Sequence, residues 1–324
     1  MTPDFKVIAG GVNITPQIKD RLLGLTITDE AGTKADTVEI TLDDRDGLIE
    51  LPVPGARLLV FLGYRETGLV PMGLFTSDEV MVSSPPATLT IRAKAADLGG
   101  SIKDQKTRSW DKTTIGEIVG KIAGEHDLTP KVSERFRAVR IEHIDQTDES
   151  DIGFLDRLGR DHDALVSVKG GALLFMGKGE GRTVSGQPIP PRPVIESDTT
   201  TWTLTLTTRE AYKSVSAIWQ DTKGAKRQEV TAGSGTPVLK LRHIHKTEDE
   251  AKTAANAKLG EIARGNDTFE ATFPGDPLIA AEGRILAAGF RAGVNGLWSI
   301  QSATHTLDGA GFSTAISAER PGAG

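Results

Sequence analysis

The stretch "QTDESDIGFLDRLGRDHDALVSVKGGALLFMGKG", residues 146–179, combines a helix signal and a hairpin signal in direct succession. In its first half, acidic residues crowd the first turn, where the helix dipole favours negative charge, and apolar residues recur at helical spacing. Its second half shows two short strands that turn at Gly170 and Gly171, since glycines are common in tight hairpins. We therefore expect a helix followed by a β-hairpin, as part of a small α/β domain.

Another helix is expected just before this stretch, in "TTIGEIVGKIAGEHDL". Thr114 and Glu117 have the spacing of a capping box, in which each side chain accepts a backbone hydrogen bond at the helix start. Apolar residues follow at helical spacing, and Gly124 is a suitable place for the helix to end. The α/β domain should therefore contain two helices and a hairpin.

Residues 5–96 show the pattern of an antiparallel sheet. In "TVEITL", the apolar Val38, Ile40 and Leu42 alternate with polar residues, so one face of the strand is buried and the other is wet. Similar segments are separated by Gly, Pro and Asp clusters, which punctuate short strands. A barrel or a sandwich is the expected architecture of this region.

A second β-rich region follows the proline-rich segment "SGQPIPPRPVIESD", which cannot donate a regular ladder of hydrogen bonds and marks a boundary near residue 190. This region carries one expected helix, from about Glu248 to Arg264. The expected domains are residues 1–105, 106–190 and 191–324. The expected fold is mainly β with α+β, in which two β-barrel domains flank a small α/β domain.

The composition excludes several classes of protein. The 324 residues carry a net charge of −6 and include no cysteine, which excludes disulfides, zinc thiolates and cysteine nucleophiles. No run of Lys and Arg is long enough to follow a phosphate backbone, so we expect no sequence-specific nucleic-acid binding. No apolar run approaches the roughly 20 residues needed to span a bilayer, so we expect no membrane insertion.

The histidine pair in "RHIHKTEDEAKTAANAKL" is the main candidate for a metal site. On a strand, His243 and His245 point to the same side and could both bind zinc or iron. A third ligand is the difficulty, because the acids that follow fit the start of a helix: Thr247 suits the N-cap and Glu250 the third helical position. We interpret the segment as a junction between a strand and a capped helix.

Other motifs indicate no catalytic centre. The acidic turn "DDRDG", which starts at Asp43, lacks the first and twelfth ligands of a calcium loop. The loop "GKGEGR", which starts at Gly177, lacks the spacing of a phosphate-binding loop, and no GxSxG elbow occurs. We expect no catalytic residue, no metal ligand and no cofactor.

Residues 146–179 resemble the signature of phage tail hub proteins of the late control gene D family, which is shared with the N-terminal part of the type VI secretion spike protein VgrG. The family pattern is a glutamine, a short gap, Glu-Ser-Asp, Phe-Leu and Arg-Leu before a hairpin. It is matched by Gln146, Glu149, Ser150, Asp151, Phe154, Leu155, Arg157 and Leu158. The family's usual glycine before the hairpin is Asp163 here. The β-rich segments on both sides resemble the family's first barrel and its closing strands, so the resemblance covers nearly the whole chain.

This resemblance implies a structural protein, not an enzyme: the baseplate hub of a contractile phage tail or of a tail-like bacteriocin. Its barrels would resemble the tail tube subunit, and a homotrimer would present them as a pseudo-sixfold ring that adapts the hexameric tube to the trimeric spike. The implied partners are the protein itself, the tail tube, tail spike and tape measure proteins and other baseplate proteins, while DNA only passes through the channel. The implied location is the virion tail baseplate or a tail-like particle, made in the bacterial cytoplasm.

Two alternatives remain open. The first keeps the family and makes the chain a hub component of a type VI secretion spike, although such proteins usually continue into their own spike. The second is a metal-dependent hydrolase that uses His243 and His245.

Overall fold

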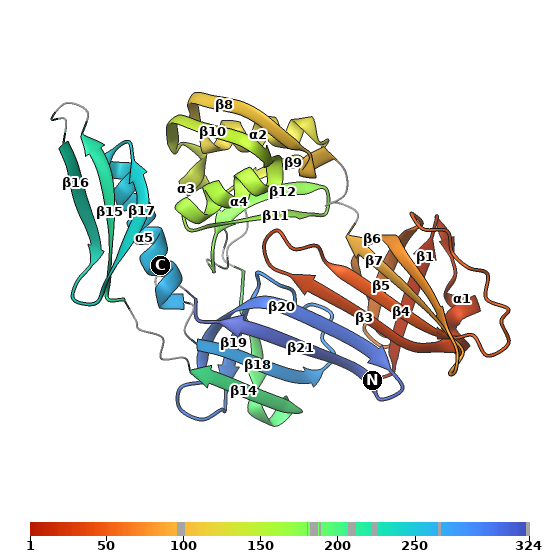
Figure 1. Cartoon of the computed structure of the whole chain (residues 1–324). Helices are drawn as coiled ribbons and strands as arrows, with labels where there is room; N and C mark the ends of the chain where they lie inside the picture. Colours follow the sequence, from red (N-terminus) through yellow and green to blue (C-terminus); the bar gives the residue numbers. More distant parts are fainter. Residues whose placement is uncertain are drawn as a thin grey trace.

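The computed structural model describes residues 1–95, 101–179, 181, 187, 189–206, 212–221, 224, 226–264 and 267–321. A 13-stranded sheet includes strands from both ends of the chain, and three smaller sheets accompany it (Figure 1). The fold is therefore mainly β with α+β, as the sequence predicts.

The large sheet joins the two β-rich regions edge to edge, because β3 of the first pairs with β20 of the second. Its strands follow the order β14 (Thr201–Leu206), β18 (Asp267–Pro274), β21 (Gly311–Glu319), β20 (Gly296–Asp308), β3 (Leu22–Glu30), β4 (Thr37–Asp43), β7 (Thr88–Ala95), β6 (Gly68–Ser83), β5 (Arg57–Tyr64), β1 (Pro3–Ala9) and β2 (Val12–Asn13). Off this path, β19 (Arg284–Ala288) pairs with β20, and β13 (Arg192–Ile195) pairs with β19. Within the described residues the path ends at β14 and β2, so the two expected barrels are not closed: each region continues into the other instead of pairing its own outer strands.

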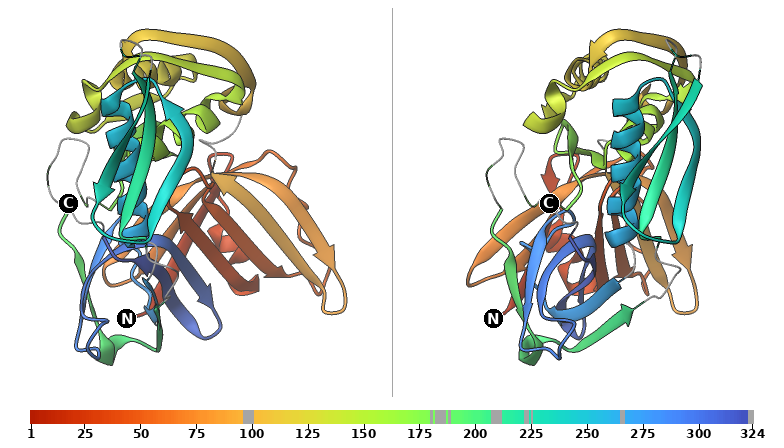
Figure 2. Two further views of the ribbon diagram at one scale, coloured as in Figure 1. Left: turned by 60° about the vertical axis from the view of Figure 1, so that its left-hand side comes forward. Right: turned by 90° about the vertical axis from the view of Figure 1, so that its left-hand side faces the viewer.

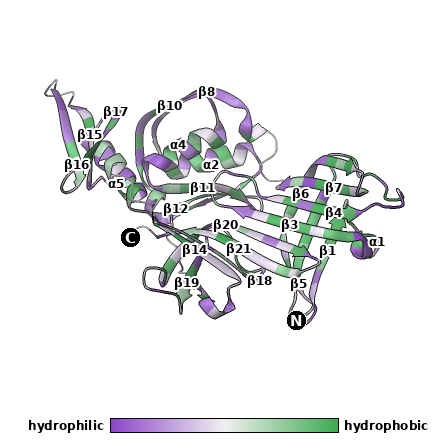
Figure 3. Cartoon of the chain, turned by 60° about the horizontal axis from the view of Figure 1, so that its bottom comes forward, coloured by the Kyte–Doolittle hydropathy of each residue, from purple (hydrophilic) through white to green (hydrophobic). Residues whose placement is uncertain are grey.

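Polar and apolar residues alternate along many strands of the large sheet (Figure 3), which gives such a strand a core face and an outer face. In β4, Val38, Ile40 and Leu42 are each 1% exposed, and the polar residues between them point the other way. Each β-rich region has its own hydrophobic core, and Leu307 and Phe312 of the second region reach into the core of the first. Short helical segments connect the strands: α1 (Thr15–Ile18), η1 (Lys19–Arg21) and η4 (Glu196–Asp198).

The two β-rich regions repeat one six-stranded topology. In sheet order the first is β3-β4-β7-β6-β5-β1, and the second is β14-β18-β21-β20-β19-β13. When the six strands of each set are counted along the chain, strands with the same count hold the same position in the sheet. By this count β14 corresponds to β3, and β20 corresponds to β6. We call them the N-terminal unit (β1 and β3–β7) and the C-terminal unit (β13, β14 and β18–β21). They differ in one pairing, because β1 is antiparallel to β5 whereas β13 is parallel to β19.

The residue registers of the two units repeat as well. The pairing of β6 with β7 and that of β20 with β21 each contain one bulge, at Asp78 and at Gln301. The buried Phe75 and Trp298 occupy corresponding places before these bulges. The sequence carries a faint trace of the repeat, since "DTVEITL" at residues 36–42 corresponds to "DTFEATF" at 267–273. The sequence predicts two similar β-rich regions, but it does not predict that the pairing registers of their strands correspond.

The α/β domain lies beside the large sheet and has its own core (Figure 1). In it, β8 pairs with β10, and β12 lies between β11 and β9. Its elements are η3 (Ser101–Lys103), β8 (Gln105–Thr114), α2 (Ile115–Glu125), β9 (Thr129–Val132), α3 (Glu134–Arg137), β10 (Arg140–Ser150), α4 (Asp151–Asp161), β11 (Ala164–Lys169) and β12 (Ala172–Gly177).

The predicted caps and turns of this domain are present. Thr114 and Glu117 form the capping box of α2, which continues one residue beyond the expected stop at Gly124. Gly170 and Gly171 have φ values of 57° and 72°, as the two central residues of a type I′ hairpin require. Asp163, which replaces the family's glycine, also has a positive φ of 52°. Aspartate adopts this left-handed conformation more readily than most other residues, so the local turn is kept.

An insertion separates β14 from β18 in the C-terminal unit. It forms a three-stranded sheet of β15 (Ser214–Asp221), β16 (Lys226–Gly233) and β17 (Val238–His245), and α5 (Glu248–Arg264) covers one face of this sheet (Figure 2). The predicted bounds of α5 are confirmed. Small buried residues such as Ala251 and Ala255 let the helix lie close to Val215 and Ala217 of the sheet. The helix thus packs on its own small sheet, and it also contacts α4 of the α/β domain.

Candidate functional site

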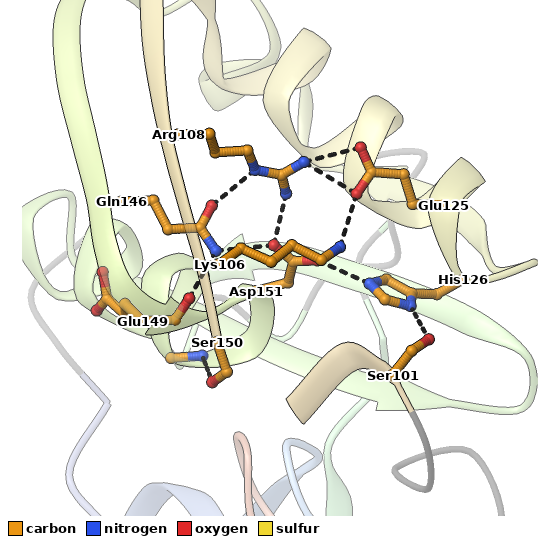
Figure 4. Close-up of polar contacts among 10 residues, drawn as sticks. Ser101, Lys106, Arg108, Glu125, His126, Gln146, Glu149, Ser150 and Asp151 are labelled. Atoms are coloured by element: carbon orange, nitrogen blue, oxygen red, sulfur yellow. Dashed lines mark hydrogen bonds and ion pairs between the residues drawn. The ribbon is translucent and has the colours of Figure 1, made fainter. Parts of the chain in front are cut away.

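The signature stretch brings a buried carboxylate to the start of α4 (Figure 4). The side chain of Asp151 is fully buried, and it accepts hydrogen bonds from four side chains. The donors are Lys106 Nζ at 2.6 Å, Arg108 Nη2 at 2.5 Å, His126 Nε2 at 2.8 Å and Gln146 Nε2 at 2.8 Å. Residues from β8 and β10, together with the C-cap residue of α2, therefore meet at one carboxylate at the start of α4.

Strand geometry explains why these donors converge. Lys106 and Arg108 are two residues apart on β8, so both side chains project from the same face of the strand. Gln146 is paired with Arg108 across the β8–β10 ribbon, and its Oε1 accepts a hydrogen bond of 2.9 Å from Arg108 Nε. Glu125, at the end of α2, accepts from Lys106 at 2.9 Å and from Arg108 at 2.8 Å. The network is continuous over all of these residues.

The two carboxylates are held in their charged forms. Burial raises the pKa of Asp151, but hydrogen bonds from Lys106, Gln146 and His126 outweigh it, and the pKa lies below its usual value. Burial likewise raises the pKa of Glu125, and Lys106 with Arg108 brings it below the usual value. The hydrogen bond to Asp151 raises the pKa of Lys106. At neutral pH the cluster consists of ion pairs.

Glu125, His126 and Asp151 form a group of three metal-type ligands, with ligand atoms within 4.8 Å of one another. The cationic groups of Lys106 and Arg108 already bind both carboxylates. Because these side chains supply the positive charge that a metal would bring, the arrangement fits an internal ion-pair network that joins β8 to two helices. Lys106 and Arg108 were not predicted from the sequence as members of this network. Two basic residues separated by one position on a strand could have indicated them, because such residues project from the same face.

The other signature residues fix α4 in place. Ser150 caps the helix, since its Oγ accepts from the backbone N–H of Gly153 at 3.2 Å. Arg157 donates to Glu149 at 2.8 Å, which ties the helix to the end of β10. The apolar members are buried in the domain core: Phe154, Leu155 and Leu158. The structure thus gives each residue of the signature a role in packing.

The histidine pair lies at the end of β17, where the sequence predicts it. The rings of His243 and His245 are 4.9 Å apart between centroids. Thr247 caps α5 by accepting from the N–H of Glu250 at 3.2 Å, and the Glu250 carboxylate accepts from the N–H of Lys246 at 3.0 Å. In the part of the chain that the structure describes, the two histidines belong to no group of three metal-type ligands. The nearby acid Glu250 completes a helix cap, which supports the interpretation of this segment as a junction between a strand and a capped helix.

The outer face of the large sheet is polar around β3 and β4 in the N-terminal unit and around β14 and β18 in the C-terminal unit. It carries two shallow depressions, of about 330 and 300 Å³. Their linings correspond between the units: Thr26 and Glu39 line the first, and their counterparts Thr203 and Glu270 line the second. One polar surface therefore repeats along the sheet.

The two basic residues that line the first depression, Arg92 and Lys94, are engaged in ion pairs. Arg92 contacts Glu39 at 2.7 Å and Glu79 at 3.1 Å, and Lys94 contacts Asp78 at 2.5 Å. Hydroxyl groups and acids dominate the rest of the lining. Such a surface offers little attraction to a polyanion, because the positive charges are already neutralised. Separately, none of the helices in the described ranges has both the length and the apolarity needed to cross a membrane.

Comparison with known sequences identifies relatives over almost the full length. The profile of the phage tail baseplate hub (GPD) family matches residues 77–310. The probable baseplate hub proteins of Escherichia phage 186 and Escherichia phage P2 are each 34% identical to this chain, over 98% of the chain and 93% of each relative.

Solved structures share the fold at much lower identity. The 43 kDa tail protein of prophage MuSo2 from Shewanella oneidensis has a TM-score of 0.73 and 16% identity, over 99% of both chains. A tail protein from Neisseria meningitidis MC58 has a TM-score of 0.75 and 11% identity, over 99% of this chain and 97% of that one. An Escherichia coli component of the type VI secretion system has a TM-score of 0.54 and 14% identity, over 92% of this chain and 73% of its own.

The family match and the two phage relatives agree with the resemblance in the signature stretch. They assign the chain to the baseplate of a phage tail, where it meets other baseplate proteins as a structural component and not as an enzyme. The chain belongs to the phage tail baseplate hub (GPD) family.

Proposed function

We propose that this hub acts as a homotrimer that connects the hexameric tube of a contractile phage tail, or of a tail-like bacteriocin, to a trimeric spike. The observation that carries the proposal is the internal repeat, in which each chain has two units of the same topology joined in one sheet. Three chains about a threefold axis would present six such units. Their ring would match a sixfold partner at one end and a threefold partner at the other.

The open sheet supports assembly into a ring. β14 ends its path in the described residues, and such an end strand leaves backbone N–H and C=O groups without strand partners. Such edges promote association with other chains. Closed rings built from head-to-tail contacts pair these edges and prevent open-ended growth.

The polar outer face is our candidate for the channel lining. It extends over both units, and in a ring of six units it would form one continuous surface. Its neutralised basic residues suit a channel through which DNA and the tape measure protein pass without being held.

We also propose the division into three domains, residues 1–105, 106–190 and 191–324, which is supported by separate hydrophobic cores. The first boundary moves to before η3, because Ile102 packs in the core of the α/β domain. The insertion between β14 and β18 adds a fourth core within the last domain. The domains would have different partners: the two units would contact the tube and spike proteins, and the α/β domain would contact other baseplate proteins.

A type VI secretion hub remains the second candidate, because its fold is shared. That likeness concerns the fold alone, whereas the phage hubs match in sequence over 98% of the chain. The phage machine is therefore favoured.

The proposal is tested by native mass spectrometry of the purified chain, followed by negative-stain imaging of its complex with the spike protein of a neighbouring gene. We expect a trimer of the chain and a threefold ring with a central pore. A compact particle without a pore would refute the channel.

A further inference from the structure

The junction between the two units within one chain shows how two units pair. Residues 302–308 of β20 run antiparallel to residues 24–30 of β3. Thr304 lies opposite Thr28, and the two hydroxyl oxygens are 3.5 Å apart. This junction is a continuous stretch of sheet that crosses from the C-terminal unit to the N-terminal unit of the same chain.

The repeat identifies the counterpart of each strand in the junction. The counterpart of β20 in the N-terminal unit is β6, and the counterpart of β3 in the C-terminal unit is β14. The backbone around the bulges agrees with this assignment. Ser77 bonds to Ala56 and Gly55 through its N–H and C=O, and Ile300 bonds in the same way to Gly283 and Glu282.

Among the described residues, both counterparts have one side that pairs with no strand. β14 pairs with β18 and with no other described strand. β5 pairs with β6 only as far as Thr76, so residues 79–83 of β6 have β7 on one side and no described strand on the other. In Figure 1 these two free sides lie toward opposite ends of the large sheet.

Exposed apolar side chains mark both free strands. Leu206 on β14 is 64% exposed, and Val82 and Met81 on β6 are 55% and 40% exposed. An uncharged apolar edge strand tends to recruit another strand, and soluble proteins usually protect such edges. In the described part of the chain, nothing covers these two.

We infer that β14 of one copy pairs antiparallel with residues 80–83 of β6 in the next copy, and so repeats between chains the junction that β20 and β3 form within the chain. The inference rests on the proposed homotrimer and specifies its contact. Transferring the register of the in-chain junction gives Val80 opposite Leu206, Met81 opposite Thr205, Val82 opposite Leu204 and Ser83 opposite Thr203.

This register matches side chains of similar character. Val80 and Val82 would meet Leu206 and Leu204 on the core side of the sheet. Met81 and Thr205 would meet on the outer face, as Thr304 and Thr28 do within the chain. Because the side-chain period of a strand is two, a shift by one residue would bring apolar side chains against polar ones on both faces.

Cysteine cross-linking tests the register directly, because the chain has no cysteine of its own. In the full chain, Met81→Cys is combined with Thr205→Cys, and the protein is oxidised at high concentration. Directly opposite residues have Cβ atoms about 4.5–5.5 Å apart, close enough for a disulfide after a small adjustment. We expect disulfide-linked trimers that return to single chains when a reductant is added.

Two matched variants control this experiment. Thr28→Cys with Thr304→Cys should form a disulfide within one chain and leave the mass unchanged, which reports that the in-chain junction is folded. Met81→Cys with Leu204→Cys is shifted by one residue and places the two thiols on opposite faces, so it should give less than about a tenth of the cross-linked product.

The outcomes separate this inference from the proposed trimer. Linked trimers from the Met81 and Thr205 pair, without product from the shifted pair, support both. A trimer in native mass spectrometry that fails to cross-link overturns the strand pairing and leaves the trimer standing. A chain that stays monomeric at every concentration and forms no cross-link overturns the inference together with self-assembly of the isolated chain.

Discussion

The N-terminal and C-terminal units share topology and register but differ in what connects their first two strands. In the N-terminal unit, residues 31–36 join β3 to β4, whereas residues 207–266 join β14 to β18 and include a sheet and a helix with their own core. The pairing registers, including the bulges at Asp78 and Gln301, are unaffected by this difference. The comparison teaches that the pairing of strands defines the unit, and that the connection is free to carry unit-specific structure.

The short connection is also where the N-terminal unit meets the other domains. Lys169 of the α/β domain bonds Asp29 and lies 3.7 Å from Asp36. The carboxylate of Glu282, from the C-terminal unit, accepts from the N–H of Gly32 at 3.3 Å. The corresponding place in the C-terminal unit, Asp267, is instead near Arg320 at 3.8 Å. Asp36 thus lies at the junction between domains, which we call the buried junction, whereas the corresponding Asp267 belongs to a more exposed pair with Arg320.

The largest effect is expected from replacing the corresponding core residues Phe75 and Trp298 with alanine. Phe75 and Trp298 are 1% and 0% exposed, and each substitution by alanine should cost about 3–5 kcal/mol of unfolding free energy. Trp298→Ala should cost more, since Trp298 also donates to the carbonyl of Val294 at 2.7 Å. Hydrogen exchange read by mass spectrometry should rise within the mutated unit. Leu74→Ala, at an adjacent residue that is 38% exposed, is the control. Equal rises in both units would show that they unfold as one body.

The α/β domain, which has no repeat, should respond separately. Asp151→Ala removes a fully buried acceptor from Lys106 and Arg108, and we expect a loss of about 3 kcal/mol confined to this domain. Asp156→Ala, which breaks an exposed pair with Arg160, should change stability by less than about 0.5 kcal/mol. Denaturant unfolding followed by local hydrogen exchange measures both variants. Faster exchange in β4 or β18 of the aspartate variant would contradict a separate domain.

The same carboxylate gives a pH dependence with a definite sign. The pKa of Asp151 is lower in the folded chain than its ordinary value of 3.8, so the unfolded chain takes up the proton first as the pH falls. Its stabilisation is therefore present above about pH 4 and is lost as the pH falls through the folded pKa. Thermal unfolding between pH 3 and pH 6 should show a steeper loss in the natural chain than in Asp151→Ala.

A smaller effect of opposite sign is expected at the buried junction. Burial and the neighbouring Asp29 raise the pKa of Asp36 from 3.8 to about 6, and Lys169 opposes them. The folded chain therefore holds this proton more tightly, so stability at this place is greatest below pH 4 and falls as the pH rises to about 6. Asp36→Asn should remove most of this loss of stability between pH 4 and pH 7. Asp267→Asn, at the corresponding place, is the matched comparison, and a similar change in both variants would argue against a special junction.

The smallest effect is expected in the insertion. Thr247→Ala removes the acceptor for the N–H of Glu250 and should cost about 1 kcal/mol of local stability in α5. Faster hydrogen exchange should be confined to the first turns of α5. Thr253→Ala, within the same helix and away from its cap, provides the comparison. Exchange that spreads to β14 and β18 would mean that the insertion stabilises the unit that carries it.

Local features were predictable from the sequence because they depend on neighbouring residues. The capping box at Thr114, the start of α5 at Glu248 and the hairpin at Gly170 all follow from short-range rules, and the structure confirms them. The junction of β3 with β20 joins residues almost 280 positions apart, and no short-range rule specifies it. The donors around Asp151 were missed for the same reason, since Lys106 is 45 residues away along the chain.

The matched bulges at Asp78 and Gln301 have a consequence for the geometry of a closed ring. A bulge adds one residue to one strand of a pair, bends that strand and increases its local twist. Both units carry the extra residue at the same place, so we expect both to bend the sheet by a similar amount. In a ring of identical radius throughout, each unit must turn the sheet through the same angle. In the proposed ring, deleting either extra residue would make alternate segments unequal, so the curvature of the sheet and the diameter of the proposed bore would depend on these two positions.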